Sequence, residues 1–359
     1  MAKNYILKTV LIVSFISGGL YLQAQHDPYY THFRFNNQAY NPAVAGVKVD
    51  NICITALTHF QYRHYDDETF VRGTEIGNNP QVVKNVAPET HNLNINTLLN
   101  IDKRGRNKVG IGFTLLDDKV GFMKTTTMKG QVNYKKTLQG NFNFISVGVE
   151  VGSTSFGYDD PKFKYIDPGD KNIPITGGNA SNLDLGVGIM YHQKTFLNKI
   201  QDFWVGAAYN HLNAAKYQFT VTMADNGNRG VDMDFVRYLY LSAGGDYMMA
   251  NKNWKLEPAI LVKYNPKLQI DLSTTALYAN SLRCGLAYRS MADAISLIVG
   301  YEKWNIQIGY SYDITLSGVR RVSDGTHELF AKYCIPISFP PPPEKIFRLS
   351  PRFLGKGAY

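Results

Sequence analysis

The sequence has few cysteines and no long apolar stretch beyond its N-terminal region. Its three cysteines, Cys53, Cys284 and Cys334, match no metal-binding spacing. All three lie in segments with strand character, so we predict small apolar strand residues rather than a disulfide framework. After Gln25 no apolar run reaches the roughly 20 residues that a membrane-spanning helix needs.

Clustered charge is also missing. The chain carries a formal net charge of +9, and removing Lys3 and Lys8 with an N-terminal signal leaves 9 − 2 = +7. Surfaces that bind nucleic acid gather Lys and Arg on one face. The positive charge is spread along this chain, so we predict no nucleic-acid partner. Gly177-Gly178 predicts a turn rather than a phosphate-binding loop, and we predict no cofactor.

Residues 1–24 predict a secretory signal peptide. Lys3 and Lys8 are followed by an apolar region at 10–22, and Leu22 and Ala24 precede a plausible cleavage site before Gln25. The apolar region is too short for a membrane anchor. No cysteine follows it, which excludes a lipoprotein signal.

The remaining sequence is rich in aromatic residues and alternates with period two. It contains 24 Tyr, and aromatic residues make up 13% of the chain. The clearest alternation places Trp304, Ile306, Ile308, Tyr310 and Tyr312 on one face and Asn305, Gln307, Gly309, Ser311 and Asp313 on the other. Such a strand suits a wall between lipid and water. An equally clear strand sets Ile95 against Asn94.

Repeating this pattern predicts an all-β, closed antiparallel transmembrane β-barrel over residues 51–337. The predicted strands are Asn51–Tyr65, His91–Asp102, Lys108–Asp117, Thr125–Thr137, Asn141–Phe156, Ser181–Thr195, Asp202–Leu212, Arg237–Met249, Trp254–Tyr264, Lys267–Tyr278, Leu282–Arg289, Ala294–Glu302 and two between Trp304 and Ile335. These are about 14 strands. Every even-numbered connection is short, as in outer-membrane barrels, so we predict that both termini are periplasmic.

Two terminal segments flank the predicted barrel. The N-terminal lead-in, residues 25–50, has too many aromatic residues for a disordered segment. We expect it to be ordered inside the barrel or across its periplasmic mouth, or against a partner. The tail, residues 338–359, starts with a proline spacer and carries a charge of +3, from four basic residues and one acidic residue after it. The residues predicted to bind a partner are Tyr29, Phe33, Phe35, Tyr40, Phe347, Arg348, Arg352 and Phe353.

No catalytic or metal-binding pattern emerges. His327-Glu328 at a strand start favours a structural hydrogen-bonding role, and no serine has a recognisable base partner. Asp117-Asp118 and the acidic residues at 159–170 lack EF-hand spacing, so we predict no metal. Arg320-Arg321 in an outer loop could contact acidic partner groups or lipopolysaccharide, although solvated loop charge is the default.

Two stretches resemble the PorP/SprF family of the type IX secretion and gliding apparatus of Bacteroidetes. They are QHDPYYTHFRFNNQAYNPAVAG at residues 25–46 and GYSYDITLS…DGTHELFAKY at residues 309–333. Thr326 stands where the family usually has Ser, and the proline-rich tail is a further departure. The resemblance implies a non-enzymatic outer-membrane barrel that binds secreted surface adhesins or the periplasmic lipoprotein ring of the machine. Barrel geometry alone leaves a diffusion porin or transporter as the alternative.

Overall fold

The computed structural model describes most of the chain between residues 27 and 337. The described ranges are 27–46, 50–63, 87–102, 105–138, 143–158, 176–223, 225–265, 267–290, 294–316, 318 and 323–337. The predicted signal peptide and the C-terminal tail lie outside them.

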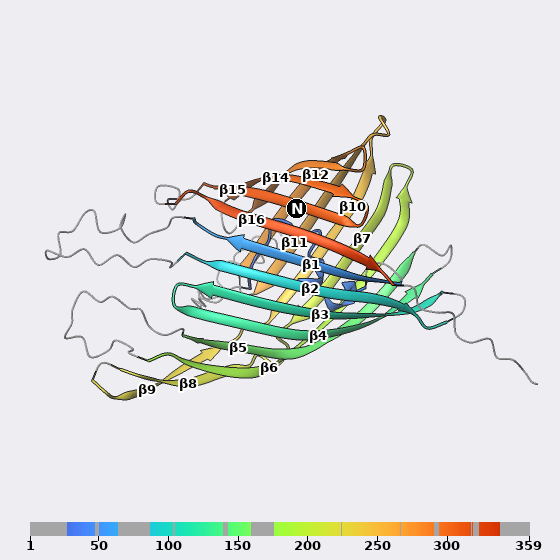
Figure 1. The fold of residues 1–359 in the computed structure, drawn as a ribbon. Helices are drawn as coiled ribbons and strands as arrows, with labels where there is room; N and C mark the ends of the chain where they lie inside the picture. The colour runs from blue at the N-terminus through green and yellow to red at the C-terminus, as the bar shows by residue number, and fades with distance from the viewer. Residues whose placement is uncertain are drawn as a thin grey trace, which may run out of the picture.

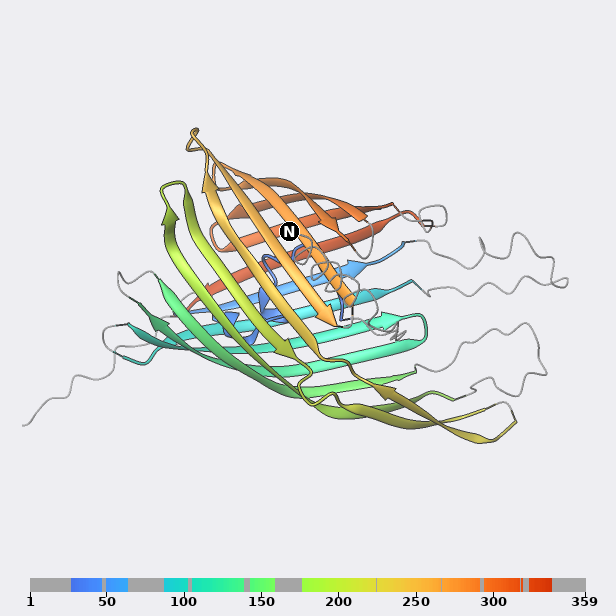
Figure 2. The same ribbon diagram turned by 180° about the vertical axis from the view of Figure 1, so that it is seen from behind.

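Fourteen antiparallel strands form a closed barrel (Figures 1 and 2), which confirms the predicted fold class. Each strand pairs with its sequence neighbours around the wall, except that β7 pairs with β10, and β1 closes the barrel against β16. The strands are β1 (Asn51–Phe60), β2 (Glu89–Asn100), β3 (Asn107–Val120), β4 (Met123–Thr137), β5 (Phe144–Tyr158), β6 (Gly178–Leu197), β7 (Ile200–Asn210), β10 (Tyr238–Met248), β11 (Trp254–Asn265), β12 (Lys267–Tyr278), β13 (Leu282–Arg289), β14 (Ala294–Lys303), β15 (Ile306–Thr315) and β16 (Thr326–Pro336).

The connection between β7 and β10 contains a hairpin that was predicted as a loop. Its strands are β8 (Lys216–Thr222) and β9 (Asn228–Asp234), and they form a separate two-stranded sheet. Figure 1 shows this hairpin extending past the end of the barrel. Tyr217, Phe219 and Val221 are buried together with Phe156 of β5, so an apolar cluster holds the hairpin to the wall. Sequence alternation over seven residues is too short to distinguish such a hairpin from a loop.

Side chains alternate between an apolar outer face and a polar lumen. In β5 the outward residues Ile145, Val147, Val149 and Val151 are exposed, whereas Ser146 and Glu150 are buried inside. Trp304 is an exception to the predicted strand positions. It lies in the two-residue turn between β14 and β15 with a φ of 57°, because tight hairpin turns require left-handed backbone conformations.

All connections at one end of the barrel are short, whereas the long connections lie at the other end, together with short turns such as the one between β3 and β4. The turns from β6 to β7 and from β14 to β15 contain residues 198–199 and 304–305, whereas the connection from β1 to β2 runs over residues 61–88. Asn51 of β1 pairs with Pro336 of β16, so the barrel begins and ends at the end that carries the short even-numbered turns. No described helix is long and apolar enough to cross a membrane.

A disulfide joins Cys53 and Cys334, which corrects the prediction of three unpaired cysteines. The two residues are directly opposite each other in the β1–β16 register and are separated by 281 residues in the sequence. Their side chains point into the lumen and are buried, whereas Cys284 is free and exposed on β13. The sequence could not reveal the pair, because it depends on the register of barrel closure. The disulfide therefore fastens the seam between the first and last strands.

Loss of this disulfide should destabilise the barrel. A cross-link that closes so long a loop stabilises a protein by about 2–4 kcal/mol. We expect the double variant Cys53→Ser, Cys334→Ser to lose stability of this order in urea unfolding from lipid, with Cys284→Ser as the unchanged control. Alkylation of all three cysteines at equal rates under non-reducing conditions would show that the disulfide is not formed.

Depth in the membrane can be tested on the outward face of β2. Ile95 lies mid-strand, and Ile101 follows the last residue of β2 on the same face. Ile95→Arg should cost about 2–4 kcal/mol on folding into lipid, and Ile101→Arg about 0–1 kcal/mol. Asn94 is unsuitable as the comparison, because its buried amide donates to Asn36 in the lumen. Equal costs at the two isoleucines would place this strand outside a bilayer.

Candidate functional site: the plugged lumen and its outer cavity

Residues 27–46 lie inside the barrel and are here called the plug. Figures 1 and 2 show this dark blue segment within the ring of strands. Tyr30, Phe33 and Tyr40 are buried, and they form one apolar cluster with wall residues that include Trp204 and Phe330. The plug therefore has a small hydrophobic core of its own against the wall.

The C-terminal half of the plug contains two 3-10 turns. They are η1 (Asn37–Ala39) and η2 (Pro42–Val44). The Asn41 side chain accepts a hydrogen bond from the Ala43 N–H at 2.9 Å, and Pro42 starts the second turn, which is the usual position for each residue. The wall makes room here with glycine, since a Cβ at Gly148 would lie 2.6 Å from the Ala43 nitrogen.

Glu328 of β16 is the first polar anchor of the plug. Its carboxylate accepts hydrogen bonds from the backbone N–H groups of Thr31 and His32, at 2.9 and 2.7 Å. It also contacts Nδ1 of His32 at 2.6 Å and Nδ1 of His59 at 2.9 Å, and all four residues are buried. These bonds agree with the structural role predicted for His327-Glu328. The sequence could not supply the partners, because His32 and His59 become neighbours of Glu328 only when the barrel closes.

Arg34 of the plug donates hydrogen bonds to the barrel wall where the backbone ladder between strands is interrupted. The β7–β10 register shifts between Gly244 and Asp246, and Pro258 of β11 has no N–H to donate. The Arg34 guanidinium donates to the carbonyl oxygens of Gly245 and Pro258, at 3.3 and 3.1 Å, and forms an ion pair with Asp246. A fixed fork of donors suits such a set of acceptors.

Asp27 is the third anchor, at the end of the lumen where the long connections lie. Its backbone N–H donates to the Tyr238 hydroxyl at 3.0 Å, and its carboxylate contacts Nε2 of His211 at 3.1 Å. Nδ1 of His211 lies 2.9 Å from Asp184, which is 3.0 Å from the Lys129 ammonium. The anchor thus belongs to a chain of alternating charges.

Asp27 and His211 shift each other's pKa. His211 follows the end of β7, and Asp27 belongs to the plug. Burial alone lowers the pKa of His211, but the carboxylates of Asp27 and Asp184 outweigh burial and raise it to about 9. Burial alone raises the pKa of Asp27, but the charge and hydrogen bonds of His211 hold it well below its ordinary value. Both groups are charged at neutral pH.

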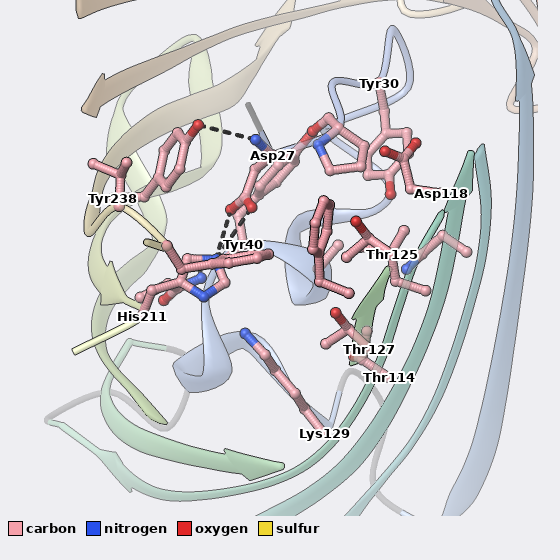
Figure 3. A pocket seen from close by; sticks show the side chains of 18 of the residues that line it. Asp27, Tyr30, Tyr40, Thr114, Asp118, Thr125, Thr127, Lys129, His211 and Tyr238 are labelled. Carbon is pink, nitrogen blue, oxygen red and sulfur yellow. Dashed lines mark hydrogen bonds and ion pairs between the residues drawn. The ribbon is translucent and has the colours of Figure 1, made fainter. Parts of the chain in front are cut away.

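A cavity of about 110 Å³ lies beside this anchor. Figure 3 shows Asp27, His211 and Tyr238 on one side of it and Asp118 and Thr125 on the other. Its remaining walls are mainly aromatic or aliphatic, with Tyr30, Tyr40, Leu116, Val120, Met123, Phe156, Phe235 and Val236 among them. An apolar pocket with a few polar groups is the usual form of a small binding site.

The aromatic residues predicted to bind a partner have wall contacts in this structure. The guanidinium of Arg289 lies 4.1 Å from the ring centre of Tyr29, that of Arg283 lies 4.5 Å from Phe35, and Phe33 and Tyr40 are buried. A partner could reach these side chains if the plug moved, so their partner-binding role stays a prediction. Arg320, Arg321, Phe347, Arg348, Arg352 and Phe353 lie outside the described residues.

The described residues hold no group of three His, Cys, Asp or Glu side chains arranged to bind a metal ion. Asp117 accepts from Thr126 on the outer face of β3, and Asp118 accepts from Thr90 inside. The acidic residues at 159–170 are outside the described ranges.

Raising the pH should loosen the Asp27 end of the plug. The pKa of His211 is raised from 6.5 to about 9, so its stabilising contribution is complete below pH 6.5 and is lost as the pH rises through 9. Hydrogen exchange at residues 29–31, corrected for intrinsic rates, should be slower at pH 6 than at pH 9.5. His211→Gln should abolish this difference, whereas His327→Gln should keep it. Wild-type protection that is equal at both pH values would contradict the assignment.

Several solved structures match this chain, with sequence identities and TM-scores too low to bear on its function. A FadL homologue from Pseudomonas aeruginosa is 12% identical with a TM-score of 0.48, covering 87% of this chain and 95% of its own. The toluene transporter TbuX from Ralstonia pickettii is 13% identical with a TM-score of 0.47, covering 83% and 92%. The translocator domain of the autotransporter NalP from Neisseria meningitidis is 8% identical with a TM-score of 0.44, covering 85% and 96%.

The search of curated proteins found no match. A family model is more informative, since the model for the type IX secretion system membrane protein PorP/SprF matches residues 22–333. The matched range contains both sequence stretches that resemble this family, the whole plug and nearly all of the barrel. The chain therefore belongs to the PorP/SprF family of type IX secretion system membrane proteins.

Proposed function

We propose that this protein is an outer-membrane barrel that serves type IX secretion by binding protein partners, and that it does not conduct solutes. The observation that carries the proposal is the plug, which is anchored to wall strands far apart around the barrel. Glu328 is on β16, Asp246 is on β10, and Asn133 of β4 donates to the plug carbonyl of Ala45 at 2.6 Å. A lumen crossed in this way has little room for diffusing solutes.

The lengths of the connections support a proposed orientation. Outer-membrane barrels have short periplasmic turns and longer external loops. We infer that the long connections and the β8–β9 hairpin face outward and that both chain termini are periplasmic. Secreted adhesin-type proteins would then meet the outer end, and the sequence positions of Arg320 and Arg321, between β15 and β16, make these two residues the proposed contacts for acidic groups or lipopolysaccharide.

The C-terminal tail is the proposed contact with the periplasmic lipoprotein ring. The four consecutive prolines in the sequence predict a semi-rigid spacer of roughly 3 Å per residue. Phe347, Arg348, Arg352 and Phe353 follow it, and mixtures of aromatic residues and arginine are enriched at protein interfaces. A tail that lies on membrane headgroups is the alternative that the experiment below excludes or supports.

Conductance in planar bilayers tests the plugged lumen. The wild-type barrel should pass little current, whereas deletion of residues 27–42 should raise the single-channel conductance by at least about tenfold, because the freed polar lumen fills with water. Glu328→Ala should give intermittent opening, with Glu302→Gln at the exposed rim as the control. Porin-like conductance of the wild type would favour the diffusion function.

Pull-down from native membranes tests partner binding. Deletion of residues 344–359 should leave the barrel folded and heat-modifiable on gels but remove periplasmic partners. The double variant Phe347→Ala, Phe353→Ala should weaken the same capture, and Arg320→Ala should leave it unchanged. Recovery of the same partners in the same amounts by the truncated protein would exclude the tail as the docking segment.

A further inference from the structure

We propose that the cavity beside Asp118 binds an organic cation, namely the ammonium or guanidinium of a lysine or arginine side chain presented by a secreted partner. The assignment of the cation to a partner protein rests on the proposed function. The cation site itself rests on the charge and shape of the cavity.

Asp118 differs from the other carboxylates that face the lumen. Each of the others contacts a basic side chain: Asp27, Glu150, Asp184, Asp246, Glu257, Asp271, Glu302, Asp313 and Glu328. Asp118 accepts a hydrogen bond from the Thr90 hydroxyl at 2.5 Å and has no ion pair with any Lys, Arg or His of the described residues. A carboxylate half-enclosed by protein without a counter-ion is costly, so it favours a cation from outside.

The other charges around the cavity already have partners. Asp27 and His211 contact each other, and Lys129 lies 2.9 Å from Glu150 and 3.0 Å from Asp184. Tyr30, Tyr40 and Tyr238 add hydroxyl groups to the lining but no charge at neutral pH. Among the charged side chains that line the cavity, Asp118 is therefore the one that has no oppositely charged partner in the described part of the chain.

The size and walls of the cavity suit a cation on an apolar stem. Its volume of about 110 Å³ is somewhat smaller than the ~150 Å³ cavity that holds a benzene molecule in an engineered protein core. Apolar groups such as Val120, Phe156 and Val236 line it, so methylene groups gain contacts while the charged end reaches Asp118. A hard metal ion fits less well, because it requires several oxygen ligands that converge on one point.

A side chain can reach this cavity from the end of the long connections. Asp118 lies near the end of β3, three positions before Gly121, the first residue of the two-residue β3–β4 turn, and it remains partly exposed. Val120 and Met123, which flank this turn, are lining residues. Under the proposed orientation this end faces the cell exterior, where a secreted protein arrives.

Ligand binding by the full-length protein in deuterated detergent micelles tests the site, with saturation-transfer NMR as the readout. The probes are n-butylammonium and its neutral and anionic counterparts, 1-butanol and butyrate. Butylammonium should bind saturably to the wild type. Asp118→Asn, which keeps an acceptor for Thr90, should weaken it at least about tenfold, because a hydrogen bond to a charged group is worth about 1.5–3 kcal/mol. Asp117→Asn, on the outer face of the same strand, should have no effect.

Further measurements separate the possible outcomes. A blocked Gly-Lys-Gly peptide should displace butylammonium, and binding of the free amine without the peptide would overturn the assignment to a partner side chain. Asp118→Asn should unfold at the same temperature as the wild type or higher, because it removes an uncompensated charge; a clear loss of stability would indicate a structural role instead. No saturable binding by the wild type, or equal binding by Asp118→Asn, would overturn the cation site. None of these measurements involves conductance or the tail, so failure of the cation site can be distinguished from failure of the proposed function.

Discussion

The pairing of buried charges between the plug and the wall is the interaction on which the rest of the structure depends. A polar lumen is ordinarily hydrated, and filling it with protein removes that water from every inward side chain. A buried carboxylate is then stabilised by a basic partner. Glu328 and Asp246 of the wall obtain partners from the plug, and Asp27 of the plug obtains His211 from the wall side. The plug in turn has too little apolar surface to fold alone, so it is ordered by the wall that it fills.

Closure of the barrel and docking of the plug are coupled for the same reason. Glu328 lies on β16, directly opposite His59 of β1 across the closing seam, and both contact each other while Glu328 holds His32. The Cys53–Cys334 disulfide crosses the same seam at its other end. Arg34 likewise completes the wall where the register shifts at Gly244. In a barrel that closed without the plug, the wall groups that bond to the plug would be hydrated instead.

Sequence alone predicted the features that have a local signal. Alternation of period two identified the strands and the separation of Asn94 from the outward face of Ile95, and connection length identified the two ends of the barrel. Features that depend on strand register could not be predicted from the sequence. Cys53 and Cys334 were wrongly predicted to be unpaired, and the β8–β9 hairpin was predicted as a loop. A single short segment does not indicate which segment it pairs with. The partners of Glu328 and the isolated charge of Asp118 depend on residues up to 297 positions apart.

The plug also restricts where this barrel can act. A wall that faces lipid and a lumen filled with protein leave the two ends for contacts with other proteins. At the end that carries the long connections, the β8–β9 hairpin packs its apolar face against the wall and presents Lys216, Gln218 and Arg229 to solvent. Beneath it, Asp118 is the one lumen-facing carboxylate of the described residues that contacts no basic side chain, and it lies next to the mouth. A carboxylate left unpaired where solvent can reach it, in a lumen whose other described carboxylates contact basic side chains, is the arrangement expected of a binding group rather than of a structural one.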